Sequence, residues 1–169
     1  MSPKIEKRQH AVNSKSTRAT RTAEGEAFSA LVVKIFQLNG RLLTIGDALT
    51  APAQQSSARW QVLAAVEREP RSVASIARQL GLARQSVQRV ADLLERDGLA
   101  QYSENPNHLR AKLLELTDAG RSVLDSIASA QHAWANRIGA ELTLPLLLRT
   151  NRSLASVLKL LTDDAPAED

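Results

Sequence analysis

Two short apolar patterns on either side of Gly81 constrain the fold more than any other feature of this 169-residue chain. The first pattern comprises Val73, Ile76, Ala77 and Leu80, and the second comprises Val87, Val90, Ala91 and Leu94. Both follow the i, i+3, i+4, i+7 spacing of an amphipathic helix. Gly81 and Gly98 can each adopt the left-handed conformation that ends a helix. The spacing therefore predicts two helices joined by a short turn, which is the geometry of a helix-turn-helix.

The first two turns of the second helix carry the candidate binding residues. If the apolar residues face the core, the side chains that point outward or lie at the margin are Arg84, Gln85, Ser86, Gln88 and Arg89. Arginine can form paired hydrogen bonds with guanine and glutamine with adenine, and the N-terminal half of such a helix enters the major groove. We expect a DNA-reading surface here. An ordinary surface helix of mixed charge is the alternative.

A hairpin is expected after the second helix. Leu99 to Ser103 and Ala111 to Leu116 can form two strands, and a polar, turn-rich segment joins them. Arg110 near the tip, with Lys112 behind it, is placed to contact phosphate or a minor groove. Residues 71 to 112 carry seven basic and four acidic residues, a surplus of +3. We therefore predict a winged helix-turn-helix DNA-binding region over residues 57–116.

Long amphipathic helices are expected on both sides of this region. The first spans residues 24–50, and a short helix follows from about Ser57, its expected N-cap, towards the break at Pro70. Two more, over residues 117–162, begin near Thr117 and Pro145. Their apolar surface exceeds what one small lobe can bury, so we expect them to dimerise; a monomeric helical bundle is the alternative. The predicted fold class is mainly α, a winged helix-turn-helix with N- and C-terminal dimerisation helices and a small β-hairpin wing.

Composition limits the remaining possibilities. Residues 1–23 hold six basic residues and one acidic residue, which predicts a flexible basic arm, and residues 163–169 form an acidic tail. The chain has no cysteine and three scattered histidines, so we expect no metal site and no cofactor. Catalytic constellations and a phosphate-binding glycine loop are missing from the sequence, which argues against an enzyme. The apolar stretches fall short of a membrane span, and we expect a cytoplasmic protein.

Three segments of the sequence carry a resemblance to the MarR family of bacterial transcriptional regulators, over roughly residues 25 to 162. They read ARWQVLAAV from residue 58, SIARQLGLARQSVQRVADLLERDGL from residue 75 and LRAKLLELTDAGR from residue 109. The resemblance implies an obligate homodimer whose terminal helices join two winged helix-turn-helix lobes. Members usually have an acidic residue two positions before the wing arginine, where this chain has His108. The hairpin is therefore expected to be looser or pH-sensitive, unless His108 is an ordinary exposed histidine.

The expected function is that of a sequence-specific DNA-binding regulator that acts as a homodimer on a pseudo-palindromic site, and by resemblance a repressor. The alternative is a winged-helix protein-interaction or ligand-binding module that does not read DNA. The family often binds small molecules between its dimerisation and DNA-binding regions. A possible effector pocket would be lined by Phe36, Arg59, Trp60 and Trp134, with an aromatic or phenolic ligand implied by resemblance alone. The alternative is that these aromatic residues belong to the hydrophobic core, as aromatic residues at helical spacing commonly do.

Overall fold

The computed structural model describes residues 20–106 and 111–163, which fall into two units, Met1–Gly40 and Arg41–Asp169. The order of elements is α1 (Ala23–Thr50), the 3-10 turn η1 (Ala51–Ala53), α2 (Ser57–Ala65), β1 (Arg71–Ser72), α3 (Val73–Leu80), α4 (Arg84–Arg96), β2 (Ala100–Ser103), β3 (Leu113–Leu116), α5 (Asp118–Ala140) and α6 (Leu144–Asp163). Helix α1 begins in the first unit and ends in the second. The mainly α fold and the terminal helices are as expected.

The helix-turn-helix is bounded by the glycines that the sequence indicated. Gly81 has φ +65° and Gly98 has φ +70°, both in the left-handed region. The Leu82 amide donates to the Ala77 carbonyl at 3.0 Å, and the Leu99 amide donates to the Leu94 carbonyl at 2.9 Å. These are the long-range bonds of the Schellman motif, which satisfy carbonyl groups that a helix end leaves without partners. The predicted ends of both helices are confirmed.

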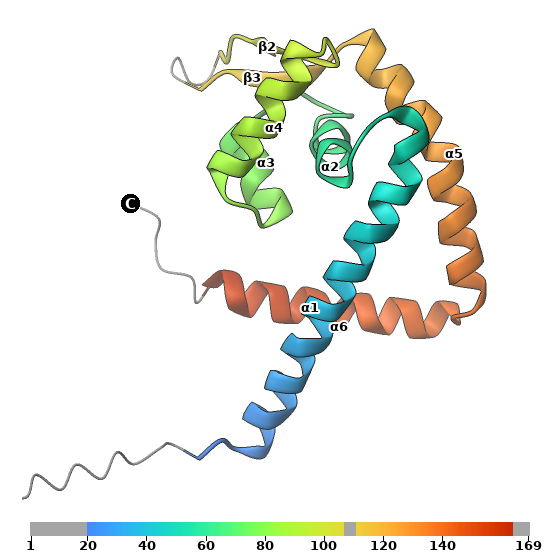
Figure 1. The fold of residues 1–169 in the computed structure, drawn as a ribbon. Coiled ribbons are helices and arrows are strands. Elements are labelled where there is room, and N and C mark those ends of the chain that lie inside the picture. Colours follow the sequence, from blue (N-terminus) through green and yellow to red (C-terminus); the bar gives the residue numbers. More distant parts are fainter. Residues whose placement is uncertain (1–19, 107–110, 164–169) are drawn as a thin grey trace, which may run out of the picture. The chain divides into compact units, whose positions relative to one another are not determined.

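The sheet has three antiparallel strands in the order β1-β3-β2. Strands β2 and β3 form the predicted hairpin, with Ala100 opposite Leu116 and Ser103 opposite Leu113. The two-residue strand β1 was not predicted; it pairs with β3 through Arg71 opposite Leu114. Because β3 is the central strand, it has a paired neighbour on each side. Figure 1 shows the β2–β3 hairpin at one end of α4, with α2 and α3 beside that helix.

The hydrophobic core lies between α2, α3, α4, the sheet and the start of α5. Its completely enclosed residues, each no more than 1% exposed, include Val62, Leu63, Ile76, Val87, Ala91, Leu94 and Leu114. Both apolar patterns around Gly81 contribute to this cluster, while Leu80 and Val90 pack half-buried at its edge. The rotation of α3 and α4 about their axes is therefore fixed by burial, as the spacing of the apolar residues predicted.

The start of α2 differs from the expectation. Its N-cap is Ser56, whose side chain accepts a hydrogen bond from the Arg59 amide at 3.3 Å, and not Ser57. Ser57 is buried, and its amide donates to Asp47 Oδ1 at 2.7 Å. A Cβ at Gly46 would lie 2.6 Å from Ser57 Oγ. Gly46 therefore allows α1 to approach α2 closely.

Helices α1 and α6 expose extensive apolar surface. In α6 none of the residues is buried. One helical stretch, Ala23–Ala53, is long and apolar enough to cross a membrane when only length and composition are considered. By these two measures, the expectation that every apolar stretch is too short for a membrane span is wrong. An apolar helix that packs against protein passes the same test. Both helices thus have more apolar surface than the described chain covers.

Candidate nucleic-acid interface

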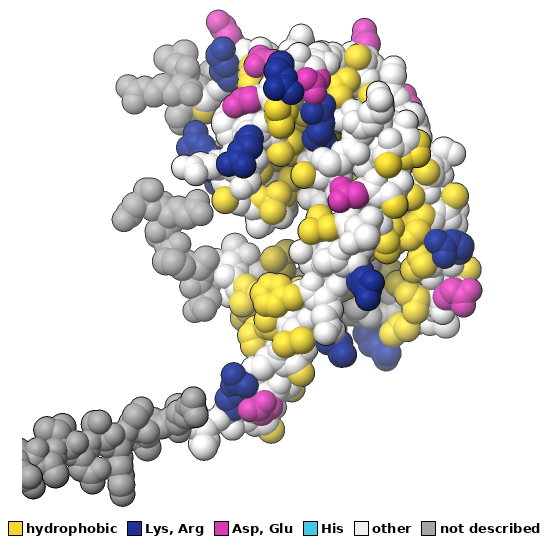
Figure 2. Space-filling model, viewed as in Figure 1, with side chains coloured by type: hydrophobic (Ala, Val, Ile, Leu, Met, Phe, Trp, Pro, Cys, Tyr) yellow, Lys and Arg dark blue, Asp and Glu magenta, His cyan; other side chains and the backbone are white. Residues whose placement is uncertain are grey.

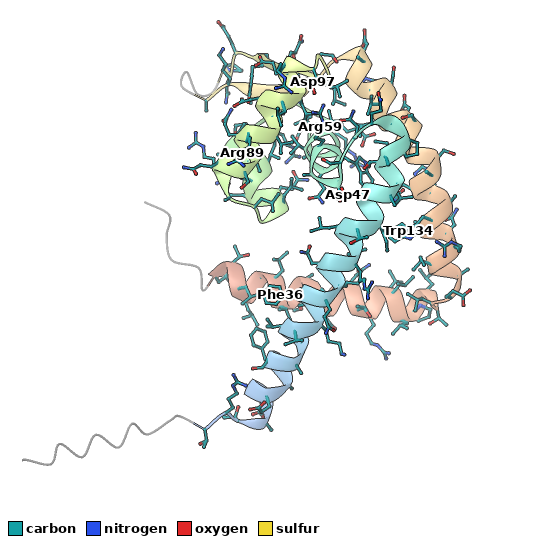
Figure 3. The ribbon with its side chains drawn as sticks, viewed as in Figure 1. Phe36, Asp47, Arg59, Arg89, Asp97 and Trp134 are labelled. Carbon is teal, nitrogen blue, oxygen red and sulfur yellow. The ribbon has the colours of Figure 1, made fainter. Side chains whose placement is uncertain are left out.

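The N-terminal half of α4 presents the predicted polar residues away from the core. Arg84, Gln85, Ser86 and Arg89 are exposed, and Gln88 is half-buried. Val87, in the middle of this set, is 1% exposed and fixes the orientation of the helix. Figure 3 shows Arg89 pointing outward from α4. The structure therefore brings these five residues to one exposed part of the helix, as expected.

The basic residues of this helix differ in whether they already have acidic partners. Arg96, in the last turn of α4, pairs with Asp97 at 3.2 Å. Within residues 20–106 and 111–163, Arg84 and Arg89 form no ion pair with any carboxylate. Figure 2 shows basic side chains over the region of α4 and the hairpin, with acidic ones interspersed. Two arginines of the N-terminal half are thus available to an anionic ligand such as a DNA backbone.

A hollow of about 360 Å³ lies between the start of α3, the start of α4 and the hairpin. Its lining residues are Ser72, Val73, Ala74, Arg84, Gln88, Tyr102, Ala111 and Lys112. Lys112 is exposed and follows the hairpin loop, while Arg84 is the first residue of α4. Helix and hairpin therefore present cations to the same hollow, so a single ligand could contact both.

Gln88 takes part in a hydrogen-bonded cluster with Asp92 and Tyr102. Its Nε2 donates to Asp92 Oδ1 at 2.7 Å and to the Tyr102 hydroxyl at 2.8 Å. The Tyr102 hydroxyl in turn donates to Asp92 Oδ1 at 2.9 Å. Burial and the hydrogen bond to Asp92 raise the pKa of Tyr102, so the hydroxyl keeps its proton at neutral pH. The cluster connects strand β2 to the N-terminal half of α4.

Sequence reasoning missed the part that Tyr102 and Asp92 play. Neither residue is among the site residues that the sequence predicted. The i, i+4 spacing of Gln88 and Asp92 is a local signal for a hydrogen bond on a helix. Tyr102 lies 14 residues from Gln88, so their contact depends on how the hairpin packs against α4.

Arg59 connects α2 to the end of α4. Its guanidinium donates to Asp97 Oδ2 at 2.7 Å and to Gln55 Oε1 at 2.6 Å, and its side chain is 17% exposed. Hydrogen bonds from Arg59 and from Arg96 lower the pKa of Asp97. Figure 3 shows Arg59 and Asp97 close to one another. Arg59, which was predicted to line an effector pocket, therefore joins α2 to the end of α4 in the structure.

The joint between hairpin and α5 is tightly packed. Thr117 caps α5 by accepting a hydrogen bond from the Gly120 amide at 3.1 Å, which confirms the predicted start of this helix. Its hydroxyl also donates to the Gly98 carbonyl at 2.7 Å. A Cβ at Gly120 would overlap the carbonyl oxygen of Leu99. Thr117 and Gly120 therefore fix the start of α5 against the end of α4.

The remaining predicted residues are placed only in part. Phe36 is 70% exposed and belongs to the first unit, whereas Arg59, Trp60 and Trp134 belong to the second. Trp60 packs half-buried against the core, and Trp134 is half-buried on α5. The effector pocket therefore stays a prediction. Arg110 and His108 lie outside the described residues, and their roles in the wing stay predictions as well.

Sequence comparison identifies the family. Residues 56–111, which include the whole helix-turn-helix, match the family model described as "MarR family". An uncharacterized protein of Mycobacterium tuberculosis is 36% identical over 141 residues, a stretch that covers 83% of this chain and 99% of the relative. The match thus extends well beyond the winged helix into the flanking helices.

Solved structures share the fold. A mutant of MarR from E. coli complexed with operator DNA has a TM-score of 0.68 at 19% identity, covering 76% of this chain and 94% of that chain. CouR from Rhodococcus jostii RHA1, bound to p-coumaroyl-CoA, has a TM-score of 0.68 at 19% identity, covering 75% and 90%. The chain belongs to the MarR family of winged-helix transcription regulators, whose function is to bind DNA.

Proposed function

We propose that this protein is a sequence-specific repressor that binds a pseudo-palindromic DNA site as a homodimer. The observation that supports this most is the exposed set Arg84, Gln85 and Arg89 on α4, beside a hollow that Lys112 also lines. Arginine and glutamine are the side chains that read guanine and adenine in the major groove. Lys112, and Arg110 by sequence position, would contact the DNA backbone or a minor groove. Ser86 and Gln88 complete the proposed contact set.

The homodimer is supported by the apolar surface of the terminal helices. On α6, Leu144 and Leu158 are each 67% exposed and Leu160 is 69% exposed. On α1, Phe36 is 70% exposed. Large exposed apolar side chains in this number mark an interaction site, and two-fold dimers are the commonest arrangement of identical chains. We therefore assign residues 24–50 and 117–162 to dimerisation.

The repressor role is proposed from the family to which the chain belongs, and we propose that a small aromatic acid relieves repression. CouR, which shares the fold, is bound to p-coumaroyl-CoA in its crystal structure. Trp60 and Trp134 are half-buried aromatic residues of the second unit that could stack on such a ligand. A thermal-shift screen of aromatic acids, with DNA release as second readout, would test this. We also propose that the protein is cytoplasmic and has no catalytic activity.

Binding of fluorescent genomic DNA fragments, measured by anisotropy at several salt concentrations, tests DNA recognition. Replacing Arg84 by alanine should weaken binding to a preferred fragment by about 1 to 3 kcal/mol, and Arg89→Ala should act similarly. Arg96→Ala is the matched control, because this arginine lies in the last turn of α4 and pairs with Asp97. Full fragment preference in both folded test variants would refute the assignment.

A further inference from the structure

The carboxamide of Gln88 is held in one orientation by the cluster that it forms with Asp92 and Tyr102. An ionised carboxylate can only accept hydrogen bonds, so the amide nitrogen, and not the amide oxygen, must face Asp92. The Tyr102 hydroxyl gives its single proton to Asp92, so it accepts from Gln88. Both N–H groups of the Gln88 amide are thereby used inside the protein.

The amide oxygen of Gln88 is the group that this arrangement leaves for a ligand. Within the described ranges, no side chain or backbone group donates a hydrogen bond to Gln88 Oε1. Gln88 and Tyr102 both line the hollow that Arg84 and Lys112 share. The oxygen is therefore an acceptor within the proposed DNA-contacting region.

We infer that Gln88 reads DNA only as a hydrogen-bond acceptor, and that Tyr102 and Asp92 are the positioning residues that determine this specificity. The inference rests on the proposed function. A free glutamine recognises adenine by accepting from N6 and donating to N7, which distinguishes adenine from every other base. An acceptor alone finds a partner in the N6 amine of adenine and equally in the N4 amine of cytosine. The base opposite Gln88 should thus be adenine or cytosine, with guanine and thymine disfavoured.

Selection of bound duplexes from a randomised pool by the full-length protein, followed by sequencing, measures this preference. The Gln88→Ala variant identifies the base position, because preference is lost there and retained elsewhere. In the wild type, adenine and cytosine should occur there at comparable frequency. Tyr102→Phe releases one N–H group of Gln88, which can then donate to adenine N7. The adenine-to-cytosine ratio should rise about 2- to 10-fold, the effect of one net hydrogen bond.

Three further variants separate positioning from stability. Asp92→Ala removes the other acceptor and should raise the same ratio, whereas Asp92→Asn keeps an acceptor oxygen and should retain the wild-type ratio. Gln101→Ala is the matched control, since Gln101 neighbours Tyr102 on β2 but pairs with Glu115 across the hairpin at 2.8 Å. Thermal unfolding checks that each variant is folded. Because Asp92 is exposed, its variants keep the test valid even if Tyr102→Phe does not fold.

The outcomes distinguish this inference from the proposed function. A wild-type preference for adenine alone, or an unchanged ratio in the folded Tyr102→Phe and Asp92→Ala variants, would overturn the inference and leave the proposed function standing. The inference would also be overturned if the Gln88→Ala variant kept the wild-type base preference at every position. If the wild type selects no motif at all, the proposed function fails and the inference fails with it.

Discussion

Replacing Leu158 by alanine should weaken the proposed homodimer strongly. Burial of a whole leucine side chain contributes about 1.5 to 3 kcal/mol, and Leu158 is still 67% exposed in the single chain. Covering the remaining two-thirds would therefore contribute about 1 to 2 kcal/mol per copy. A two-fold dimer contains the substitution twice, so the loss is about 2 to 4 kcal/mol. This corresponds to a dissociation constant about 30- to 700-fold higher.

Sedimentation velocity over a range of protein concentrations measures this change. Lys159→Ala is the matched control, because it removes a neighbouring exposed side chain of α6 that is charged at its end. Leu158→Asp should dissociate the dimer further, since it would bury an unpaired charge. If the dimer is obligate, dissociation will be accompanied by unfolding. A wild-type monomer at micromolar concentration, or equal dimer stability in Leu158→Ala and Lys159→Ala, would refute this reasoning.

Three other predictions concern packing, pH and salt. Gly120→Ala should lower the free energy of unfolding in urea because its Cβ would overlap the Leu99 carbonyl, whereas Gly139→Ala, with nothing within 4 Å of its Cβ, should not; equal effects would contradict this. The lowered pKa of Asp97 means that its stabilising contribution is present at neutral pH and is lost as the carboxylate is protonated in acid, below about pH 4. Between pH 7 and pH 3 the Tm of the Asp97→Asn variant should therefore fall by less than the Tm of the wild type. Equal decreases in Tm would contradict a stabilising contact between Arg59 and Asp97. Deleting residues 1–22 should make the plot of the logarithm of the DNA-binding constant against the logarithm of the salt concentration less steep, by roughly 3 to 4 units if each of two arms contacts about two phosphates. The sequence preference should not change, because phosphate contacts carry no sequence information. An unaltered slope would exclude such contacts.

The helix-turn-helix could be predicted because its determinants are local. The spacing of apolar residues on each side of Gly81 fixes which faces of α3 and α4 are buried. Gly81 and Gly98 terminate these helices through backbone conformations that few other residues adopt. The polar residues of α4, such as Arg89, follow from the same periodicity because they occupy the opposite face.

The contacts that could not be predicted join residues that are distant in the sequence. Arg59 and Asp97 are 38 residues apart, and Ser57 contacts Asp47 across a helix junction. Strand β1 has only two residues and exists because β3 offers a free edge to it. Tyr102 could be placed on a strand by its sequence, but its bond to Gln88 depends on the packing of the hairpin against α4. Periodicity carries no information about such pairs.

The proposal that a dimer reads DNA through α4 is tested most directly by hydroxyl-radical footprinting of the wild-type protein on its selected site. We expect two symmetric protected regions whose centres are about one helical turn, or a multiple of it, apart, because each α4 would occupy one half-site. Alanine at Arg84 and Arg89 together should abolish this pattern while the protein stays folded. A single protected region, or equal protection of unrelated DNA, would contradict the proposal.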